Sequence, residues 1–324
     1  MASARGALAA QLTSAQCDAL LAGPDPALLA ATEAWLAQPG NSLMTLADAD
    51  YPQTLLQIAD PPALLYCKGR RALLGQPGLG IVGSRNATPQ GLRDAEAFAH
   101  ALSDAGLTIV SGLALGIDAA AHRGGLAGAG SSVAVVGTGL DRIYPARNKA
   151  LAHRLANAGL IVSEFALGTP PLPGHFPRRN RLISGLSRGV LVVEATPDSG
   201  SLITARVATE QGREVFAIPG SIHSPLARGC HALIKQGAKL VESAADILDE
   251  LAWQQRLAPP RFAEANPEAA PDPVLDAFDG APTTPDALAQ RTGLTLDALS
   301  AKLLTLELEG RIAALPGGRF QKIH

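Results

Sequence analysis

Residues 79–112 have the sequence LGIVGSRNATPQGLRDAEAFAHALSDAGLTIVSG, in which two short apolar runs flank one helical segment. The apolar runs lie at 79–84 and 107–112, and both end in glycine and serine. A helix is expected between them at about 89–105. Strand, helix and strand in this order predict two parallel strands joined by a crossover helix.

The same alternation continues to residue 220. Further apolar strands are expected at 132–139, 160–164, 189–195 and 214–220, and helices at about 116–127 and 147–158. Continuous apolar strands that alternate with helices are typical of a parallel sheet covered on both faces. We therefore predict an α/β fold with a Rossmann-like, doubly wound, mostly parallel sheet.

The flanking segments predict two smaller domains and a linker. Residues 7–38 resemble two short helices broken by Gly and Pro at 23–26. The last segment has the pattern helix–turn–helix followed by a Gly-Gly hairpin, which is typical of a winged helix. The predicted parts are a small helical, SAM-like domain (1–45), an extended Rossmann-like domain (46–256), a Pro- and Ala-rich linker (257–273) and a winged helix (274–324).

The composition favours a reducing compartment and no membrane span. Apolar residues make up 47% of the 324 residues and aromatic residues 4%, so the core must consist mostly of Ala, Leu, Val and Ile. Cys17, Cys67 and Cys230 are far apart and odd in number, which predicts neither a disulfide framework nor a metal site. The chain has neither an apolar run of roughly 18 residues nor the apolar region of a signal peptide, so we expect a cytoplasmic protein.

The basic residues are concentrated in the middle of the chain, although the net charge is only −2. Residues 66–251 contain 19 basic and 14 acidic side chains, whereas residues 1–65 contain one basic and six acidic side chains. An anionic partner is therefore expected to bind the middle segment.

The carboxyl ends of the expected strands carry glycine, serine and arginine. Ligands of open parallel sheets bind beyond these ends. Glycine-rich turns and helix N-termini offer backbone N–H groups to phosphate, and the guanidinium of Arg85 can hold a phosphate with two hydrogen bonds. Tight turns alone would also require the glycines, and Ser201 is also a possible N-cap. The candidate phosphate-binding residues are Gly83, Ser84 and Arg85, with possible phosphate loops at Gly137, Thr138, Gly139 and at Ser199, Gly200, Ser201, Thr204.

A cluster of arginines follows in the sequence HFPRRNRLISGLSR at 175–188. We expect most of these side chains to lie with Arg85 on one rim of the sheet, rather than as separate surface charges. Such a groove suits several phosphates in a row, which predicts a nucleic-acid strand. The basic residues assigned to this rim are Arg147, Lys149, Arg178, Arg179, Arg181 and Arg188.

Three further motifs are only weak indications of a dinucleotide site, a nucleophilic serine or a metal site. GTGLDR at 137–142 has Arg142 where the dinucleotide fingerprint needs Gly, so no NAD and no other cofactor is predicted. Ser187 in GLSRG is preceded by a helix and followed by a strand, the reverse of a nucleophile elbow, and Gly189 is expected to be a helix C-cap. Asp118 and His122 are four residues apart on a helix, but without a third ligand a metal site is not predicted, and a local Asp–His pair or a partly buried histidine is expected instead.

Several long motifs together resemble the DNA-processing protein A (DprA/Smf) family. The resemblance covers about residues 45–250. Its motifs, in chain order, are GIVGSR (80–85), SGLALGIDAAAH (111–122), VAVVGTGLDRIYPARN (133–148), HFPRRNRLISGLS (175–187), VLVVEATPDSGSLITARVATEQGREVFAIPG (190–220) and LIKQGA (233–238).

The resemblance implies an extended Rossmann fold that binds single-stranded DNA, protects incoming strands in natural transformation and loads the recombinase RecA onto them. It also implies a homodimer formed through the Rossmann domain, and neither catalysis nor a bound cofactor. The DNA-contacting positions carried over from the family motifs are Arg85, Arg147, Arg178, Arg179 and Arg181, with Gly83, Ser84 and Asn180 in the same motifs. Leu115, Ala166 and His231 depart from the family pattern.

The low aromatic content favours contacts to the phosphate backbone over base stacking. The predicted recognition helix of the winged helix (295–310) has Lys302 against Asp297, Glu307 and Glu309, so we expect it to serve protein contacts or regulation rather than the reading of base edges.

A different class of function remains open, that of a nucleotide-binding hydrolase such as a nucleoside-phosphate glycosidase. The loop DSGSLITA would then bind a sugar phosphate, with Glu194 and Glu210 as candidate acid and base.

Overall fold

The computed structural model describes residues 12–23, 25–252, 272–279 and 281–323. Its largest part is a nine-stranded sheet with the order β1-β2-β6-β5-β4-β3-β7-β8-β9. The pairs β1–β2 and β2–β6 are antiparallel and all other pairs in this sheet are parallel, which confirms the predicted, mostly parallel sheet. The strands are β1 (Asn41–Thr45), β2 (Leu64–Gly69), β3 (Gly78–Val82), β4 (Thr108–Ser111), β5 (Ser132–Val135), β6 (Leu160–Ser163), β7 (Ser187–Val192), β8 (Glu214–Ala217) and β9 (Lys239–Leu240).

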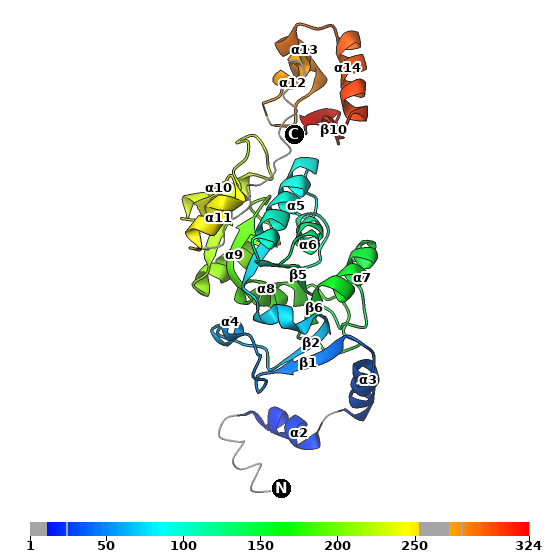
Figure 1. The fold of residues 1–324 in the computed structure, drawn as a ribbon, viewed down its shortest axis with the longest axis vertical. Helices are drawn as coiled ribbons and strands as arrows, with labels where there is room; N and C mark the ends of the chain where they lie inside the picture. The colour runs from blue at the N-terminus through cyan, green and yellow to red at the C-terminus, as the bar shows by residue number, and fades with distance from the viewer. Residues whose placement is uncertain (1–11, 24, 253–271, 280, 324) are drawn as a thin grey trace.

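Helices cover both faces of this sheet, and α5 and α6 lie side by side on one of them (Figure 1). The strands present apolar side chains to both faces, so the core is divided into layers above and below the sheet. One face is covered by α5 (Pro89–Asp104), α6 (Ile117–Ala127), α7 (Lys149–Ala158) and α11 (Ala244–Glu250). The other is covered by α4 (Gln53–Leu56), the 3₁₀ helix η1 (Arg71–Gly75), α8 (His175–Gly185), α9 (Gly200–Glu210) and α10 (Arg228–Lys235), and the short η2 (Ala146–Asn148) precedes α7.

The strand order reverses at β3. The strands β4, β5 and β6 follow it on one side, and β7, β8 and β9 lie on the other. The carboxyl ends of β3 and β7 are joined there by a hydrogen bond from the Ser84 N–H to the Glu194 carbonyl (2.7 Å). In open α/β sheets such a reversal leaves a crevice in which ligands bind.

Gly189 lies within β7 and is not the predicted helix cap, because the strand begins directly after Leu186, the C-cap of α8. Its lack of a side chain is still required. A Cβ atom at this position would lie 2.7 Å from the Phe216 ring on the neighbouring strand.

The N-terminal segment contains α2 (Ser14–Ala22) and α3 (Pro26–Leu36), followed by β1. All five residues of β1 pair with β2, so this part of the predicted N-terminal domain belongs to the large sheet. The Trp35 ring of α3 packs edge-on against Tyr66 of β2, with 5.8 Å between the centroids. The first residues of the predicted helix, 7–11, lie outside the described residues.

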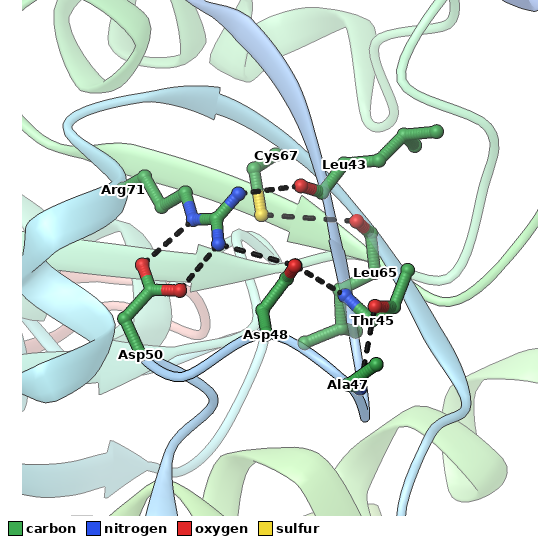
Figure 2. A network of polar contacts seen from close by, with 8 residues as sticks. All are labelled: Leu43, Thr45, Ala47, Asp48, Asp50, Leu65, Cys67 and Arg71. Carbon is green, nitrogen blue, oxygen red and sulfur yellow. Dashed lines mark hydrogen bonds and ion pairs between the residues drawn. The ribbon is translucent and has the colours of Figure 1, made fainter.

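Arg71 fixes the edge strand β1 to the body of the domain (Figure 2). Its guanidinium donates to the Leu43 carbonyl (2.6 Å), and to the carboxylates of Asp48 (3.2 Å) and Asp50 (3.0 Å). The hydrogen bond with Arg71 lowers the pKa of Asp50. An antiparallel edge strand is thus held by charge-assisted bonds as well as by its ladder.

The C-terminal part has its own apolar core and a winged-helix pattern, as predicted. Gly293, at a φ of 71°, joins the two helices of the helix–turn–helix. The elements are α12 (Pro273–Asp276), α13 (Pro285–Thr292), α14 (Leu296–Leu308), β10 (Ile312–Leu315) and β11 (Arg319–Lys322). The predicted linker lies outside the described residues, except for its last two positions.

Within the described part of the chain, we find no helix that combines the length and the apolar character needed to cross a bilayer. Cys17, Cys67 and Cys230 are all free thiols and are buried.

Candidate functional site

A cleft of about 720 Å³ lies at the carboxyl ends of the strands, where the strand order reverses. The lining comes from the end of β3 and the loop after it (82–86), from the segment before α8 and α8 itself (Pro171, Pro173, Phe176, Pro177, Arg179 and Asn180), and from the start of α9 (Ser199, Gly200, Ser201, Ile203 and Thr204). We call it the switch-point cleft. Its volume is within the range of sites for small organic ligands.

Arg85 lies at this cleft with an exposed guanidinium that has no ion-pair partner among the described residues. Its charged group lies over the Phe176 ring, 5.7 Å from the centroid. The loop that carries it is anchored, because the Ser84 carbonyl accepts a hydrogen bond from the Ile117 N–H (3.1 Å). A fixed loop therefore presents an arginine that is free to bind an anion.

Arg179 also lines the cleft, but it is only 5% exposed. Its Nη2 donates to the Gly112 carbonyl (3.0 Å), and a Cβ on Gly112 would lie 1.7 Å from Nη1, so a side chain at this position would displace the guanidinium. Burial lowers the pKa of Arg179 to about 10, although the charge of Asp118 opposes this shift. The arginine therefore remains charged at neutral pH.

Asp118 is the single carboxylate in the described lining of the cleft. Its Oδ2 accepts hydrogen bonds from the N–H groups of Gly112 (3.1 Å) and Ala114 (3.3 Å). Burial raises its pKa, while the Arg179 charge acts in the opposite direction. Asp118 thus holds the loop after β4 and compensates part of the buried positive charge.

Arg178 and Arg181 do not extend into the cleft as free charges, in contrast to the predicted rim. Both pair with Glu164, which follows β6 and has a side chain only 5% exposed. The Nε of Arg178 lies 3.0 Å from the carboxylate, and Arg181 also donates to the Asp60 carbonyl (2.6 Å). One buried carboxylate therefore pairs with both guanidinium groups, although the Arg178 side chain is still 61% exposed, and the DNA contacts of these two arginines stay a prediction.

Arg188, the last arginine of the cluster, stands near the amino end of β7, away from the carboxyl edge. Arg147 and Lys149 are exposed, but neither lines the cleft. Between them, the buried Asn148 donates to the carbonyls of Leu113 (2.8 Å) and Ala114 (3.1 Å). This bond ties the basic segment to the loop after β4.

Two aromatic residues border the cleft that sequence analysis did not select. Tyr144 is 47% exposed, and its ring lies 5.7 Å from that of Phe176 between centroids. Asn180 is partly buried and lines the same cleft. The low overall aromatic content did not indicate that these two rings lie together beside Arg85. The sequence signal that could have identified them is the position of Tyr144 in the YP motif and of Phe176 in the HFP motif.

The two predicted phosphate loops differ in access. Ser199, Gly200, Ser201 and Thr204 line the switch-point cleft at the N-terminus of α9. Gly137 and Thr138 line an adjoining cavity of about 270 Å³, which shares Arg85, Phe176 and Arg179 with the cleft. Gly139 is buried and its N–H donates to the Thr169 carbonyl (3.1 Å), so it does not offer that group to a ligand.

The carboxylates of the hydrolase alternative do not meet in one site. Both oxygens of Glu194 accept hydrogen bonds from Thr88, the N-cap of α5 (2.9 Å from N–H and 2.6 Å from Oγ1). Glu210 borders a different hollow, between α9 and α10. Burial raises the pKa of Glu194, yet its hydrogen bonds give it a structural task at a helix N-terminus.

Ser187, the serine of the GLSRG motif, is completely buried and donates to the Ile183 carbonyl (2.7 Å). No group of three potential metal ligands is found in the described ranges. His231, which departs from the family pattern, accepts a hydrogen bond at Nε2 from the Gly220 N–H (3.3 Å). Leu115, another departure, borders the adjoining cavity.

His122 is completely buried and does not pair with Asp118. Its Nε2 accepts a hydrogen bond from the Leu113 N–H (3.2 Å), so Nδ1 carries the proton and donates to Ser132 (2.7 Å). Ser132 in turn donates to the Ile109 carbonyl (2.8 Å). These hydrogen bonds connect the loop after β4, through His122 and Ser132, to the Ile109 carbonyl in β4.

Comparison with known proteins gives consistent matches. The family model described as DNA recombination-mediator protein A matches residues 42–252, and that of the DprA winged helix domain matches residues 258–318. Protein Smf of Escherichia coli is 47% identical over 292 residues, which cover 88% of this chain and 78% of that protein. DNA processing protein DprA of Streptococcus pneumoniae is 50% identical over 206 residues, which cover 64% and 73%.

Two solved structures are similar along most of the chain. The X-ray structure of DprA from Streptococcus pneumoniae has a TM-score of 0.65 at 47% identity, covering 70% of this chain and 78% of that one. DprA from Helicobacter pylori, a protein with a single-stranded DNA binding mode, has a structure that matches with a TM-score of 0.60 at 31% identity, covering 66% of this chain and 98% of that one.

The neutral His122 makes stability depend on pH. Burial lowers its pKa to about 3, whereas an unfolded histidine titrates near 6.5. Between these values the unfolded chain binds a proton that the folded chain does not, so the contribution of His122 to the free energy of unfolding falls as pH falls below about 6.5 and is constant above it. Urea unfolding between neutral pH and about pH 5 should show a loss approaching 1.4 kcal/mol per pH unit. In His122→Asn the slope over this window should be smaller, and an equal slope in both proteins would contradict the assignment.

Proposed function

This chain belongs to the DNA recombination-mediator protein A family, and from that premise we propose that it binds single-stranded DNA at the switch-point cleft. One observation carries the proposal: a free arginine, Arg85, and a buried charged one, Arg179, border the same cleft, which contains a single and already bonded carboxylate. The DprA of Helicobacter pylori, which is similar in structure, is described as binding single-stranded DNA.

In this proposal the strand lies along the carboxyl edge of the sheet. Arg85, presented by the Gly83–Ser84 turn, binds one phosphate, and Arg179 adds its charge from the same cleft. Arg147, Lys149 and Asn180 bind the strand on either side. Tyr144 and Phe176 offer ring faces to bases, which modifies our expectation of backbone contacts alone.

Arg178 and Arg181 have a different proposed task. Their pairing with the buried Glu164 holds α8 against the end of β6, which sets the position of Arg179 between them. We therefore expect them to support the strand site chiefly through the placement of α8.

The wider role we propose is that of a mediator in DNA uptake, which protects strands and loads the recombinase RecA in the cytoplasm as a homodimer formed through the Rossmann domain. This role is one of binding without catalysis. The family membership and the absence of a paired acid and base among the described cleft residues favour it over the hydrolase alternative.

Strand binding should be nearly independent of sequence and should weaken steeply with salt, because phosphate contacts release counterions. Arg85→Ala should raise the dissociation constant for oligothymidylate about tenfold and reduce the salt slope by about one unit. Fluorescence anisotropy over a salt series measures both quantities. Arg93 is an exposed arginine on α5, so Arg93→Ala serves as the control. It should bind oligothymidylate with the dissociation constant and salt slope of the unaltered protein. A flat salt response would contradict the proposal.

The winged helix should contribute little to strand affinity. In α14, Lys302 pairs with Asp272 (2.9 Å), while Asp297 and Glu307 are exposed and would repel phosphate. Removal of residues 272–324 should leave most of the affinity for oligothymidylate, because the described core of this part is separate from the sheet. Loss of nearly all strand binding in a truncated protein that still unfolds cooperatively would be the opposite result.

Recombinase loading is tested by strand exchange on DNA already covered by a single-stranded DNA-binding protein. Addition of this protein should shorten the lag before RecA acts, and Arg85→Ala should lose this effect. Light scattering should give the mass of a dimer both for the full chain and for the chain without residues 272–324. An unchanged lag would contradict the recombinase-loading role, and a monomeric mass would contradict the homodimer.

A further inference from the structure

A small hollow of about 70 Å³ lies beside α7, outside the switch-point cleft. It is bordered by α7, by β2 and β6, and by the loop after β5. Buried apolar side chains form its floor, among them Leu113, Val136 and Ile161. We call it the α7 hollow. Its volume is far below that of sites that enclose a small organic ligand, so it suits contact with one flat group at the surface.

Tyr144 connects the α7 hollow with the switch-point cleft. This residue lines the hollow, the cleft and the adjoining cavity that contains Gly137 and Thr138. Val136 is also shared between the hollow and the adjoining cavity. The three spaces therefore follow one another along the loop after β5. A chain that leaves the cleft past Phe176 and Tyr144 meets the α7 hollow next.

The rim of the α7 hollow is basic. Lys68, Arg142 and His153 line it, and the last two are exposed. Among the described residues no carboxylate lines the hollow, although the Oδ2 of Asp141 lies 3.7 Å from the Arg142 Nε just outside it. Both of these side chains are largely exposed, and such ion pairs are weak. Arg142 can therefore exchange this contact for a phosphate.

The positive charge continues along α7. Lys149, Ala152, His153 and Ala156 have the spacing of residues on one helix face, and the last three line the hollow. Lys149 therefore stands one turn before His153 on the side of the hollow. Residues 132–163 contain four Lys and Arg residues, all of them exposed, and a single acidic residue. An anionic chain is thus attracted along this side of the domain.

Exposed apolar side chains stand directly beside these charges. Ile143 is 38% exposed and Tyr144 is 47% exposed, and both line the hollow next to Arg142. A nucleotide has a flat apolar base and a charged phosphate. Apolar and basic side chains that alternate along a groove match these two parts, which is typical of surfaces that bind unpaired strands.

We propose that a single strand bound at the switch-point cleft continues across Tyr144 to the α7 hollow. One base packs there against Ile143 and the apolar floor, and its flanking phosphates lie at Arg142 and at the α7 face that carries His153. The inference rests on the proposed strand function and adds a second part to the strand site. It also gives Lys149, which is exposed but does not line the cleft, a place on the path of the strand.

The experiment measures the affinity of the full chain for oligothymidylates of about 4 to about 16 nucleotides by fluorescence anisotropy. For the shortest strand that binds, Arg142→Ala should keep the dissociation constant within about twofold of the unaltered value, because this strand fills only the cleft. For the longest strand it should raise the dissociation constant about fivefold and lower the salt slope by about one unit. Ile143→Ser should show the same dependence on length with an unchanged salt slope, because it removes no charge.

Arg93→Ala and Leu56→Ser are the matched controls. Arg93 is exposed on α5 and Leu56 is 44% exposed on α4, and neither residue lines the α7 hollow, the cleft or the adjoining cavity. Both control variants should bind strands of every length as the unaltered protein does.

The proposal is overturned if Arg142→Ala or Ile143→Ser binds the longest strand as tightly as the unaltered protein, or loses affinity equally at every length. Arg85→Ala tests the proposed function separately, because it should weaken the binding of the shortest strand as well as of the longest. Loss at every length in Arg85→Ala without a length-dependent loss in Arg142→Ala would reject the α7 hollow alone. A shortest strand that binds equally well to Arg85→Ala would reject the strand site in the cleft.

Discussion

The structure of the cleft depends on one charged and almost completely buried guanidinium, that of Arg179. The guanidinium of Arg179 in α8 donates to the Gly112 carbonyl in the loop after β4, in space that a side chain at position 112 would fill. The same loop is fixed from three other directions, by Asp118, Asn148 and His122. A buried positive charge is tolerated only where its surroundings are rigid and an anion completes it, and these contacts supply the rigidity.

The positive charge of the region is graded rather than continuous. Glu164 pairs with Arg178 and Arg181, so the positive charge that lines the cleft comes from Arg85 and Arg179. Two charges at defined positions suit the proposed binding of a few phosphates better than that of a long polyanion along a uniform surface. The rings of Tyr144 and Phe176 beside Arg85 add contacts that do not depend on charge.

Helix termini have opposite uses in the two halves of the domain. At α5 the buried Glu194 accepts from the N-cap residue, so that N-terminus is satisfied internally and is closed to ligands. At α9 the cap is the hydroxyl of Ser199, which accepts from the Ser201 N–H (3.3 Å), and the first turn borders the cleft. Glu194 thus has a structural task at the N-terminus of α5.

The sequence by itself determined the parallel sheet, its covering helices, the winged helix and the loops that line the cleft, because apolar periodicity and glycine positions are local properties of the chain. Only the tertiary structure decided which of the arginines are available. Glu164 is distant from Arg178 and Arg181 in sequence and lies against them only once β6 and α8 pack together. The antiparallel β1, the place of Gly189 in a strand and the meeting of Tyr144 with Phe176 were decided in the same way, since each depends on a neighbour that local sequence does not specify.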